Sequence, residues 1–573
     1  MGWKETYEAW KTANDLDPQV KADLDSISGD EAALADAFYQ AIDFGTAGMR
    51  GLMGAGINRM NIYTVRLATE GLARLMEAYG AKAVERGVAI AYDGRHHSLE
   101  FALESAKVLG NHGIKTYVFE GVRPTPELSY AVRHLKTYTG IMITASHNTK
   151  EYNGYKVYGE DGGQMTPEDA AALTNHIKDV DPLTIPVADL DQLKADGLYQ
   201  VIGTDVDNDY LDQVEKVTID HDIIKEVSDE VSIVYTPLQG TGQLLVEQAF
   251  ERAGFKQVIY IDEQREPNAD FSTLKSPNPE EASAFEYAMA YGKKNHADVL
   301  IATDPDADRM GVGVKMPDGE YRILTGNQIG ALLTQYILTA RSHANDLPEN
   351  SVIVKSIVSS ELPAAITKHF QVGTVNTLTG FKFIAEQIKN YEKTGEHTFV
   401  FGFEESYGFL IQPFVRDKDA VQTAVLFAEL AAYYKKQGKT PYDGLLEIFQ
   451  TYGHYAEKTL SVKLSGQEGA MKIAEIMSGL RSDMPSAIAG VAVETVEDYQ
   501  NATRYLANGE TEPIAIEKAN VLKFYLADRT WIAVRPSGTE PKIKFYIGTV
   551  AADDEAAQQQ ISQYEAFVNQ FAD

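Results

Sequence analysis

The segment ITASHNTK (143–150) places a serine, a histidine and an asparagine side by side directly after an apolar run. A serine becomes a nucleophile when a base lies within hydrogen-bond reach, so a serine hydrolase is the first possibility. In an extended loop, however, neighbouring side chains point in different directions, and we expect His147 to be poorly placed to deprotonate Ser146. The G-x-S-x-G elbow is also absent. Taken alone, the segment is more typical of a capping turn than of a catalytic loop.

The segment DPDADR (304–309) follows the apolar run ADVLIAT and spaces three aspartates two residues apart. In extended backbone this spacing predicts three carboxylates on one side, where they repel one another without a cation. An EF-hand begins similarly, but it needs Gly and Glu where this chain has Arg309 and Lys315. The pattern therefore favours a site for Mg²⁺, with a solvated acidic turn as the alternative. The three predicted ligands are Asp304, Asp306 and Asp308.

Two further segments could bind an anion and a sugar. The segment RPSGTEPK (535–542) offers a guanidinium, two hydroxyls and a glycine-containing backbone, which together can hold a phosphate; a plain turn is the alternative. The segment GFEESYG (402–408) ends a predicted strand with two carboxylates and a hydroxyl. Carboxylates accept hydrogen bonds from vicinal hydroxyls, so a sugar is a natural partner, although a surface turn fits the segment alone equally well.

These segments need elements to position them, and the chain alternates apolar, strand-like runs with helical patterns. This alternation predicts α/β domains. Six runs end in polar or glycine-containing loops and fall into three pairs, which indicates three similar α/β units in tandem, although any α/β protein can show self-similarity this weak. A smaller α+β domain is expected after them. Ligands of such sheets bind outside the carboxyl ends of the strands. The six runs span 88–95, 140–148, 231–242, 297–309, 351–360 and 397–408. The predicted domains span 1–207, 208–318, 319–450 and 451–573.

Composition limits the classes of function. The chain has 573 residues, no cysteine and a net charge of −31, from 52 basic and 83 acidic residues. The missing cysteines exclude disulfides, thiolate metal sites and cysteine catalysis. The negative field would repel nucleic acid and anionic membranes, so we expect neither as a partner. Without a long apolar run or a signal-peptide pattern, a cytoplasmic protein is expected. Nothing in the sequence assigns an oligomeric state.

The four segments occur together, in order and over nearly the whole chain, as TASHNTKEYNGYK, DPDADR, GFEESYG and RPSGTEPK. This combination resembles the α-D-phosphohexomutases, and among them the long phosphoglucomutase and phosphomannomutase branch. The resemblance implies four domains around a central cleft, a phosphorylated serine, bound Mg²⁺, sugar phosphates as substrates and glucose 1,6-bisphosphate as activator. It matches Ser146 to the phosphoserine and metal ligand, Asp304, Asp306 and Asp308 to the other metal ligands, Glu404 and Ser406 to sugar contacts, and Arg535, Ser537, Gly538 and Thr539 to the phosphate-binding loop.

The resemblance also covers further residues. Lys156 in YNGYK matches a lysine proposed for proton transfer, and Arg309 matches another active-site residue. Many relatives carry Gly where this chain has Phe403, before the Glu-Glu-Ser. The remaining matches are Thr46 and Arg50 in the N-terminal loop FGTAGMRG, Gly380, Phe381 and Lys382 in a loop that senses sugar orientation, and Lys418 as a second basic residue.

The expected activity is the interconversion of glucose 1-phosphate and glucose 6-phosphate through glucose 1,6-bisphosphate. Because phosphoryl transfer depends on positioning and charge neutralisation, Arg50, Lys156 and Arg309 are better candidate helpers than His147. FGTAGMRG also resembles a branch with phosphopentomutases and glucose 1,6-bisphosphate synthases, so those activities and phosphomannomutase remain alternatives. A sugar-phosphate-binding protein without turnover would need neither Ser146 nor the aspartates. The sequence contains neither a P-loop nor a G-x-G-x-x-G motif, which argues against an ATP-driven kinase.

Overall fold

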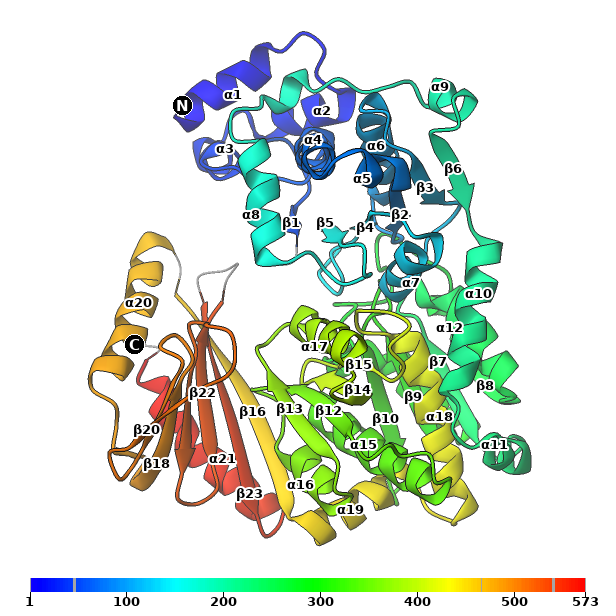
Figure 1. Cartoon of the computed structure of the whole chain (residues 1–573), viewed down its shortest axis with the longest axis vertical. Helices are drawn as coiled ribbons and strands as arrows, with labels where there is room; N and C mark the ends of the chain where they lie inside the picture. Colours follow the sequence, from blue (N-terminus) through cyan, green and yellow to red (C-terminus); the bar gives the residue numbers. More distant parts are fainter. Residues whose placement is uncertain (1, 45–47, 465, 538–541, 572–573) are drawn as a thin grey trace. The chain divides into compact units, whose positions relative to one another are not determined.

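The computed structural model describes residues 2–44, 48–464, 466–537 and 542–571. Thr46, Gly538 and Thr539 lie outside the described residues. The chain divides into two compact units, and Figure 1 follows it from the N-terminus in blue to the C-terminus in red. The first unit comprises Met1–Leu324, Ala385–Thr394 and Ser406–Thr440, and the second comprises Thr325–Ile384, Gly395–Glu405 and Pro441–Asp573.

The first unit begins with three helices and a six-stranded sheet. In this sheet β2, β3, β4 and β6 run parallel. Beyond β4, strand β5 pairs antiparallel with β4, and β1 pairs antiparallel with β5. The strands, in spatial order, are β1 (Met49–Leu52), β5 (Tyr152–Tyr158), β4 (Thr139–Ile143), β2 (Val88–Tyr92), β3 (Thr116–Phe119) and β6 (Tyr199–Ile202). The helices are α1 (Trp3–Thr12), α2 (Pro18–Ile27), α3 (Glu31–Phe38), α4 (Ile62–Tyr79), α5 (Ala81–Arg86), α6 (Ser98–Asn111), α7 (Thr125–Leu135), α8 (Pro167–His176) and α9 (Leu190–Ala195).

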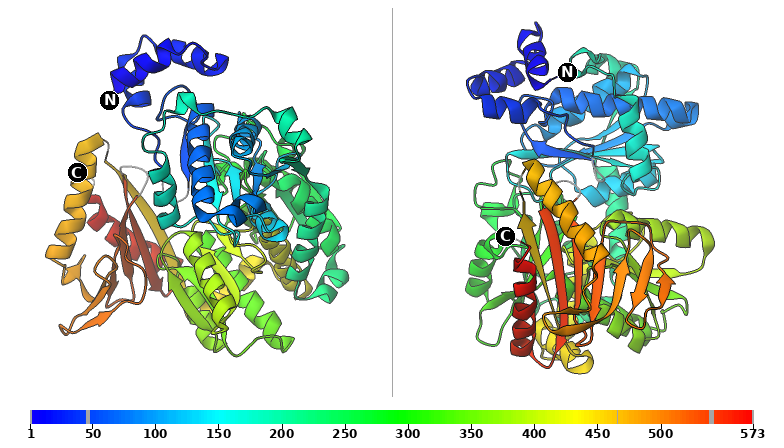
Figure 2. Two further views of the ribbon diagram at one scale, coloured as in Figure 1. Left: turned by 45° about the horizontal axis from the view of Figure 1, so that its top comes forward. Right: turned by 90° about the vertical axis from the view of Figure 1, so that its left-hand side faces the viewer.

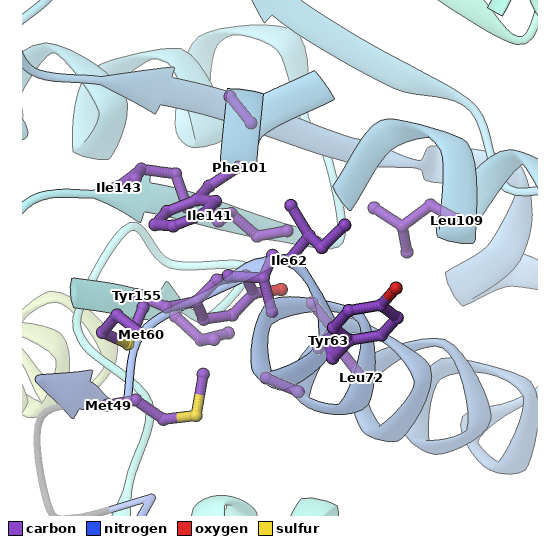
Figure 3. Packing of buried hydrophobic residues seen from close by; sticks show 14 of the residues in the cluster. Met49, Met60, Ile62, Tyr63, Leu72, Phe101, Leu109, Ile141, Ile143 and Tyr155 are labelled. Carbon is purple, nitrogen blue, oxygen red and sulfur yellow. The ribbon is translucent and has the colours of Figure 1, made fainter. Parts of the chain in front are cut away.

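The core of this region explains why α4 and α6 cover the sheet. Figure 3 shows Ile62 and Leu72 of α4 pointing at the same apolar cluster as Phe101 of α6 and Ile143 of β4. Burying side chains of this size contributes about 1.5–3 kcal/mol each. The N-terminal helices join the same core, since Trp10 packs edge-on against rings of α3 and α4. The helices therefore hold the strand ends in place.

A second sheet completes the first unit. Parallel strands β7, β8 and β9 are extended by antiparallel β10 and β11. The strands, in spatial order, are β11 (Tyr321–Ile323), β10 (Met310–Lys315), β9 (Val299–Thr303), β7 (Ser232–Thr236) and β8 (Gln257–Tyr260). The associated elements are α10 (Thr204–Val214), α11 (His221–Val227), α12 (Gly242–Ala253), α13 (Asp262–Arg265), α14 (Glu286–Asn295), β15 (Gly408–Leu410) and α18 (Ala420–Lys436).

The second unit holds a parallel group of strands and a mainly antiparallel C-terminal sheet. The parallel strands are β13 (Gly373–Thr377), β12 (Ser351–Ser356) and β14 (Thr398–Glu404). The C-terminal strands, in spatial order, are β16 (His454–Lys463), β23 (Lys542–Ala551), β22 (Trp531–Pro536), β21 (Leu522–Leu526), β18 (Val491–Asp498), β19 (Thr503–Leu506) and β20 (Thr511–Pro513), and β17 (Ala487–Ile488) pairs with β18. The helices are α15 (Gly326–His343), α16 (Leu362–His369), α19 (Pro441–Tyr452), α20 (Gly466–Ser482) and α21 (Asp554–Asn569). Helix α17 (Phe381–Thr394) begins in this unit, whereas its residues from Ala385 onward belong to the first unit.

The predicted fold class is confirmed. The six apolar runs form β2, β4, β7, β9, β12 and β14. Each predicted pair of runs forms two adjacent parallel strands within one sheet, namely β2 with β4, β7 with β9 and β12 with β14. The C-terminal domain differs, since its two helices run beside a largely antiparallel sheet, as both views of Figure 2 show. Three α/β repeats are thus followed by a domain of different topology.

A buried ionic cluster joins the two sheets of the second unit. Both Lys355 of β12 and Lys523 of β21 are fully buried, and both ammonium groups contact Oε1 of Glu361, at 3.2 and 3.1 Å. Although burial opposes it, this pairing lowers the pKa of Glu361 to about 2. Two buried charges therefore depend on one carboxylate.

We expect Glu361→Gln to destabilise the second unit by about 3 kcal/mol at pH 7, because the variant leaves two buried ammonium groups without their counter-ion. The folded pKa of Glu361 lies below its unfolded value, so its contribution is complete above about pH 4.5 and is lost as the pH falls towards 2. Urea unfolding followed by tryptophan fluorescence at pH 7 and pH 3 measures the effect. Glu494→Gln, at an exposed position of β18, is the control; equal midpoints for both variants at pH 7 would contradict the prediction.

Candidate active site

Ser146 lies in a loop at the carboxyl end of β4. Its backbone N–H donates to Oγ1 of Thr144 at 2.8 Å, and its φ of 52° lies in the left-handed region. Its hydroxyl donates to Oδ2 of Asp304 at 2.9 Å and lies 3.2 Å from Nδ1 of His147. Ser146 and the first predicted metal ligand are thus in direct contact although 158 residues separate them.

The expectation that His147 points away from Ser146 is wrong. The positive φ of Ser146 turns the chain, so the two neighbouring side chains meet instead of diverging as they would in an extended loop. Burial and the nearby guanidinium groups of Arg309 and Arg50 lower the pKa of His147 well below its ordinary value. The imidazole is therefore neutral at neutral pH and can share a hydrogen bond with the hydroxyl.

Glycines next to this loop allow close backbone packing. A Cβ on Gly154 of β5 would lie 2.5 Å from the carbonyl oxygen of Thr144, so only glycine fits between the loop and β1. Arg50 of β1 is paired with Gly154, and its guanidinium donates to Oδ1 of Asn148 at 3.0 Å. The N-terminal strand and the Ser146 loop are therefore linked by a side-chain contact as well as by the sheet.

The aspartate loop at the carboxyl end of β9 is a tight turn and not extended backbone. Ala307 has a φ of 48°, and Oδ1 of Asp304 accepts the backbone N–H groups of Asp308 and Arg309. The three carboxylates nevertheless converge, because one oxygen from each lies within 4.8 Å of the others. The prediction that the aspartates share one side is correct, but the turn and not the strand period causes it.

Two lysines partly neutralise this buried cluster. Lys156 of β5 lies 2.8 Å from Oδ2 of Asp306 and 3.6 Å from Oδ2 of Asp308, and Lys418 lies 3.1 Å from the same oxygen of Asp308. Burial and the adjacent carboxylates raise the pKa of Asp304 well above its ordinary value. Burial also opposes ionisation of Asp306, but Lys156 lowers its pKa below the usual range. The two lysines therefore contact Asp306 and Asp308, and Asp304 is the carboxylate whose ionisation its surroundings oppose.

The aspartate cluster fits a divalent cation. Oδ1 of Asp306 and Oδ1 of Asp308 are buried and accept no hydrogen bond from any residue that the structure describes. Buried carboxylate oxygens without partners are costly, and a cation satisfies them. The donor set is all oxygen, as hard cations prefer. The buried triad is thus a candidate metal site.

Three residues that the sequence reasoning missed support the cluster. Thr125, at the start of α7, donates from Oγ1 to Oδ2 of Asp306 at 2.8 Å. Asp417 accepts from the ammonium of Lys418 at 3.0 Å. Glu280 accepts from Arg309 at 2.6 Å, and Arg309 also donates to the carbonyl of Ser406. No spacing marks Thr125 or Glu280 in advance, whereas Asp417 stands in the VRDKDA segment beside Lys418.

In the second unit the predicted sugar loops meet. The backbone N–H of Gly380 donates to Oε1 of Glu404 at 2.6 Å, and Gly380 has a φ of 123°, which favours glycine. Phe381 is buried at the start of α17, and the ammonium of Lys382 lies 5.1 Å from the ring of Phe383. The segments around residues 380 and 404, although distant in sequence, therefore form one local structure.

Glu405 and Phe403 flank Glu404 and face other groups. Oε2 of Glu405 accepts the hydroxyls of Ser356 and Ser359, which anchors the loop to β12. Phe403 is fully buried, and a Cβ on Gly330 of α15 would lie 2.7 Å from its ring. The substitution of Phe for Gly thus fills space under α15.

The predicted phosphate loop follows β22. Arg535 lies opposite Lys544 in the hairpin of β22 and β23, and the backbone N–H of Ser537 donates to the carbonyl of Lys542 at 2.8 Å. Gly538 and Thr539 lie outside the described residues, as does Thr46 of the N-terminal loop. The described part of the segment is therefore the hairpin base.

Four family models match the chain in order. They are the α/β/α domains I, II and III and the C-terminal domain of phosphoglucomutase/phosphomannomutase, at residues 41–183, 208–317, 325–452 and 482–564. Phosphoglucomutases of Staphylococcus aureus are similar throughout: that of strain N315 is 41% identical over 527 residues, covering 91% of this chain and 92% of that protein. That of strain MSSA476 is 40% identical with the same coverage.

Solved structures share the fold at lower identity. The open form of pp63/parafusin, a phosphoglucomutase from Paramecium, has a TM-score of 0.69 at 17% identity, covering 93% of this chain and 96% of that one. A phosphoglucomutase/phosphomannomutase family protein from Burkholderia thailandensis has a TM-score of 0.66 at 16% identity, with 92% and 97% covered. With all four family domains in order and relatives 41% identical over nearly the whole chain, this chain belongs to the phosphoglucomutase/phosphomannomutase family, whose members are intramolecular phosphotransferases.

Proposed function

We propose that the protein is a phosphoglucomutase that interconverts glucose 1-phosphate and glucose 6-phosphate through phosphorylated Ser146 and glucose 1,6-bisphosphate. The observation that carries this proposal is the 2.9 Å contact between the Ser146 hydroxyl and Asp304, inside a buried cluster of three carboxylates. A binding protein without turnover would have no use for this costly arrangement. The choice of glucose follows the name of the Staphylococcus aureus relatives.

The reaction consists of two phosphoryl transfers. In the first, a hydroxyl oxygen of the sugar monophosphate forms a bond to phosphorus while the bond from phosphorus to Oγ of Ser146 breaks, which gives the bisphosphate. In the second, Oγ of Ser146 attacks the other phosphate of the bisphosphate and releases the isomeric monophosphate. Phosphoryl transfer gains most from positioning and charge neutralisation. Glucose 1,6-bisphosphate acts as activator because it phosphorylates an unmodified Ser146 directly.

Asp304, Asp306, Asp308 and phosphorylated Ser146 are the residues that would hold a Mg²⁺ ion. When bound, Mg²⁺ supplies charge neutralisation at the transferring phosphoryl group. The exclusively oxygen donors and the two unsatisfied oxygens of Asp306 and Asp308 support this assignment.

The basic residues next to Ser146 divide into two groups. Arg50 is tied to the Ser146 loop through Asn148, and Arg309 approaches from the aspartate loop, so both guanidinium groups are candidates to neutralise phosphoryl charge. Lys156 and Lys418 contact the aspartates directly. Lys156 is the candidate general acid and base for the sugar hydroxyl, and Lys418 pairs with Asp308.

The remaining predicted residues would bind substrate. Glu404 would accept hydrogen bonds from sugar hydroxyls, and Ser406 would exchange hydrogen bonds with them. Arg535 would bind the phosphate that is not reacting. Thr46, Gly380, Phe381 and Lys382 would contact the sugar in its two orientations, and Ser537, Gly538 and Thr539 would complete the phosphate site with Arg535. In this proposal residues 1–207 carry the phosphoserine and residues 208–318 bind the metal. Residues 319–450 bind the sugar, and residues 451–573 bind the phosphate.

No helix in the described part of the chain has both the length and the apolar character needed to cross a bilayer. The chain contains no cysteine and has a net charge of −31. Both features suit a cytoplasmic enzyme with sugar phosphates as partners and no affinity for nucleic acid or anionic membranes.

A coupled assay that compares glucose 1-phosphate, mannose 1-phosphate and ribose 1-phosphate tests the proposed function. We expect glucose 1-phosphate to give the highest kcat/KM, with turnover dependent on Mg²⁺ and on catalytic glucose 1,6-bisphosphate. A higher kcat/KM with mannose or pentose phosphate would favour those mutases on the same scaffold. Net formation of bisphosphate from a separate phosphoryl donor would indicate a synthase.

The Arg535→Ala variant should bind glucose 1-phosphate and glucose 6-phosphate about tenfold to a hundredfold more weakly. The lost bidentate, charge-assisted contact is worth about 1.5–3 kcal/mol, and one phosphate site serves both substrates. Calorimetric titration of each substrate measures the loss. Arg504→Ala, on strand β19 of the same sheet, is the control because Arg504 pairs with Glu497 and Glu512. Unchanged affinity for both substrates would show that the segment after β22 is only a turn.

A further inference from the structure

Arg95 follows β2, and its side chain is fully buried behind the Ser146 loop. Its guanidinium donates to backbone carbonyl oxygens of a single segment, residues 146–152. Nη2 donates to Ser146 and to Asn148, the latter at 2.6 Å. Nη1 donates to Thr149 at 2.8 Å and to Tyr152 at 3.2 Å. One side chain therefore binds four carbonyls of the segment that carries the proposed nucleophile.

The fifth donor of Arg95 is also occupied. Nε donates to Oδ2 of Asp93 at 3.1 Å, and Oδ1 of Asp93 accepts the hydroxyl of Ser98 at 2.7 Å. A guanidinium has five N–H donors in a fixed fork, and here each of the five has an acceptor. A lysine at this position would offer three donors without that planar geometry. The arrangement is thus specific for arginine.

The Ser146 segment needs such a partner. A serine with a φ of 52° is strained by about 1–3 kcal/mol, and the surrounding structure must hold it there. Converging carbonyl oxygens repel one another unless a donor lies between them. Arg95 binds the backbone carbonyl of Ser146, while Oγ of the same residue faces Asp304. The guanidinium of Arg95 therefore binds the backbone of Ser146, and the carboxylate of Asp304 binds its side chain.

We propose that Arg95 is a positioning residue for phosphoryl transfer, which holds the backbone of residues 146–152 so that Oγ of Ser146 stays against Asp304. Arg95 contacts the loop and not the reacting atoms. This inference rests on the proposed function, because it takes Ser146 as the group that carries the phosphoryl. The role predicts a loss in kcat without a matching change in KM, since substrate-binding residues are untouched.

A surface pocket of about 610 Å³ borders Arg95 and makes a sharp test possible. Its lining includes Arg66, Arg95, His97 and Lys107. Arg95→Ala would empty the buried space of this side chain beside the pocket, so we expect a small cation to enter that space from solvent. Added guanidinium can then replace the missing group, which is a result that a general loss of packing would not give. Arg66→Ala is a matched control, because Arg66 lines the same pocket and pairs with Glu104 instead of the Ser146 segment.

We expect Arg95→Ala to lower kcat about a hundredfold while KM for glucose 1-phosphate stays within about threefold, because small misplacement of a reacting group has effects of this size. Guanidinium chloride at tens of millimolar should raise kcat of Arg95→Ala about tenfold and leave the wild type and Arg66→Ala unchanged. The proposal would be overturned if Arg95→Ala kept the wild-type kcat. It would also be overturned if the variant lost kcat/KM through a higher KM and added guanidinium did not restore it.

Arg95→Lys keeps the charge and covers the case in which Arg95→Ala does not fold. Hydrogen exchange of the backbone amides in residues 146–152 should be about tenfold faster in Arg95→Lys than in the wild type, and kcat should fall in parallel. This exchange does not depend on mutase activity, so it separates the two hypotheses. A wild type without mutase activity would reject the proposed function, whereas wild-type exchange and wild-type kcat in Arg95→Lys would reject the role of Arg95.

Discussion

Ser146→Ala should fold like the wild type and lose at least about 10⁴-fold in kcat, because the variant removes the atom that carries the phosphoryl group in both transfers. Incorporation of label from ³²P-labelled glucose 1,6-bisphosphate should fall to background. The hydroxyl makes few contacts beyond Asp304 and His147, so we expect little loss of stability. A coupled assay, phosphoprotein autoradiography and thermal unfolding measure the three quantities.

Thr149→Ala is the matched control for this prediction. Thr149 carries the other hydroxyl near the end of the loop, but its side chain is exposed, and Arg95 binds only its backbone carbonyl. The control should keep activity and incorporate label. If Ser146→Ala keeps more than about a hundredth of the wild-type kcat, or still incorporates label, Ser146 is not the phosphorylated residue.

The sequence predicted the strand ends correctly because hydrophobic burial determines them. Runs such as VAIAY and VLIAT are buried on both faces, and a parallel sheet aligns their carboxyl ends. Ser146 and Asp304, however, follow strands of two different sheets, β4 and β9, so alignment within one sheet does not explain their contact, which depends on how the loops of the two sheets pack together. The resemblance to a family then supplied the roles, which burial and periodicity alone do not give.

The local backbone of the site could not be predicted in this way. The positive φ values of Ser146 and Ala307 make the two loops turn, and they bring His147 onto Ser146 and the aspartates together. Neither residue is a glycine, so its type does not indicate a left-handed conformation. Arg95 escaped notice for a similar reason. Its acceptors are backbone carbonyls, which have no side-chain signature, and the nearest is 51 residues away.

Asp306→Asn should lower kcat about a hundredfold to a thousandfold and shift half-saturation to higher Mg²⁺ concentration. One of three carboxylate ligands becomes a neutral amide, and a hard cation depends on ligand charge more than on shape. The change also removes the carboxylate that Lys156 and Thr125 contact, so the ammonium of Lys156 loses its closest counter-ion. We expect moderate destabilisation together with the larger kinetic loss.

Titration of activity with MgCl₂ after removal of metal by EDTA measures this prediction. The wild type should lose turnover with EDTA and regain it with Mg²⁺, whereas Asp306→Asn should need a higher concentration and reach a lower plateau. Asp298→Asn is the control, because Asp298 pairs with Lys435 and lies before β9, away from the cluster. A wild type that keeps full turnover in excess EDTA would reject the metal assignment. The carboxylates of Asp306 and Asp308 would then be stabilised by their protein contacts, chiefly Lys156, Lys418 and Thr125, and Asp306→Asn should lower stability without any dependence on Mg²⁺.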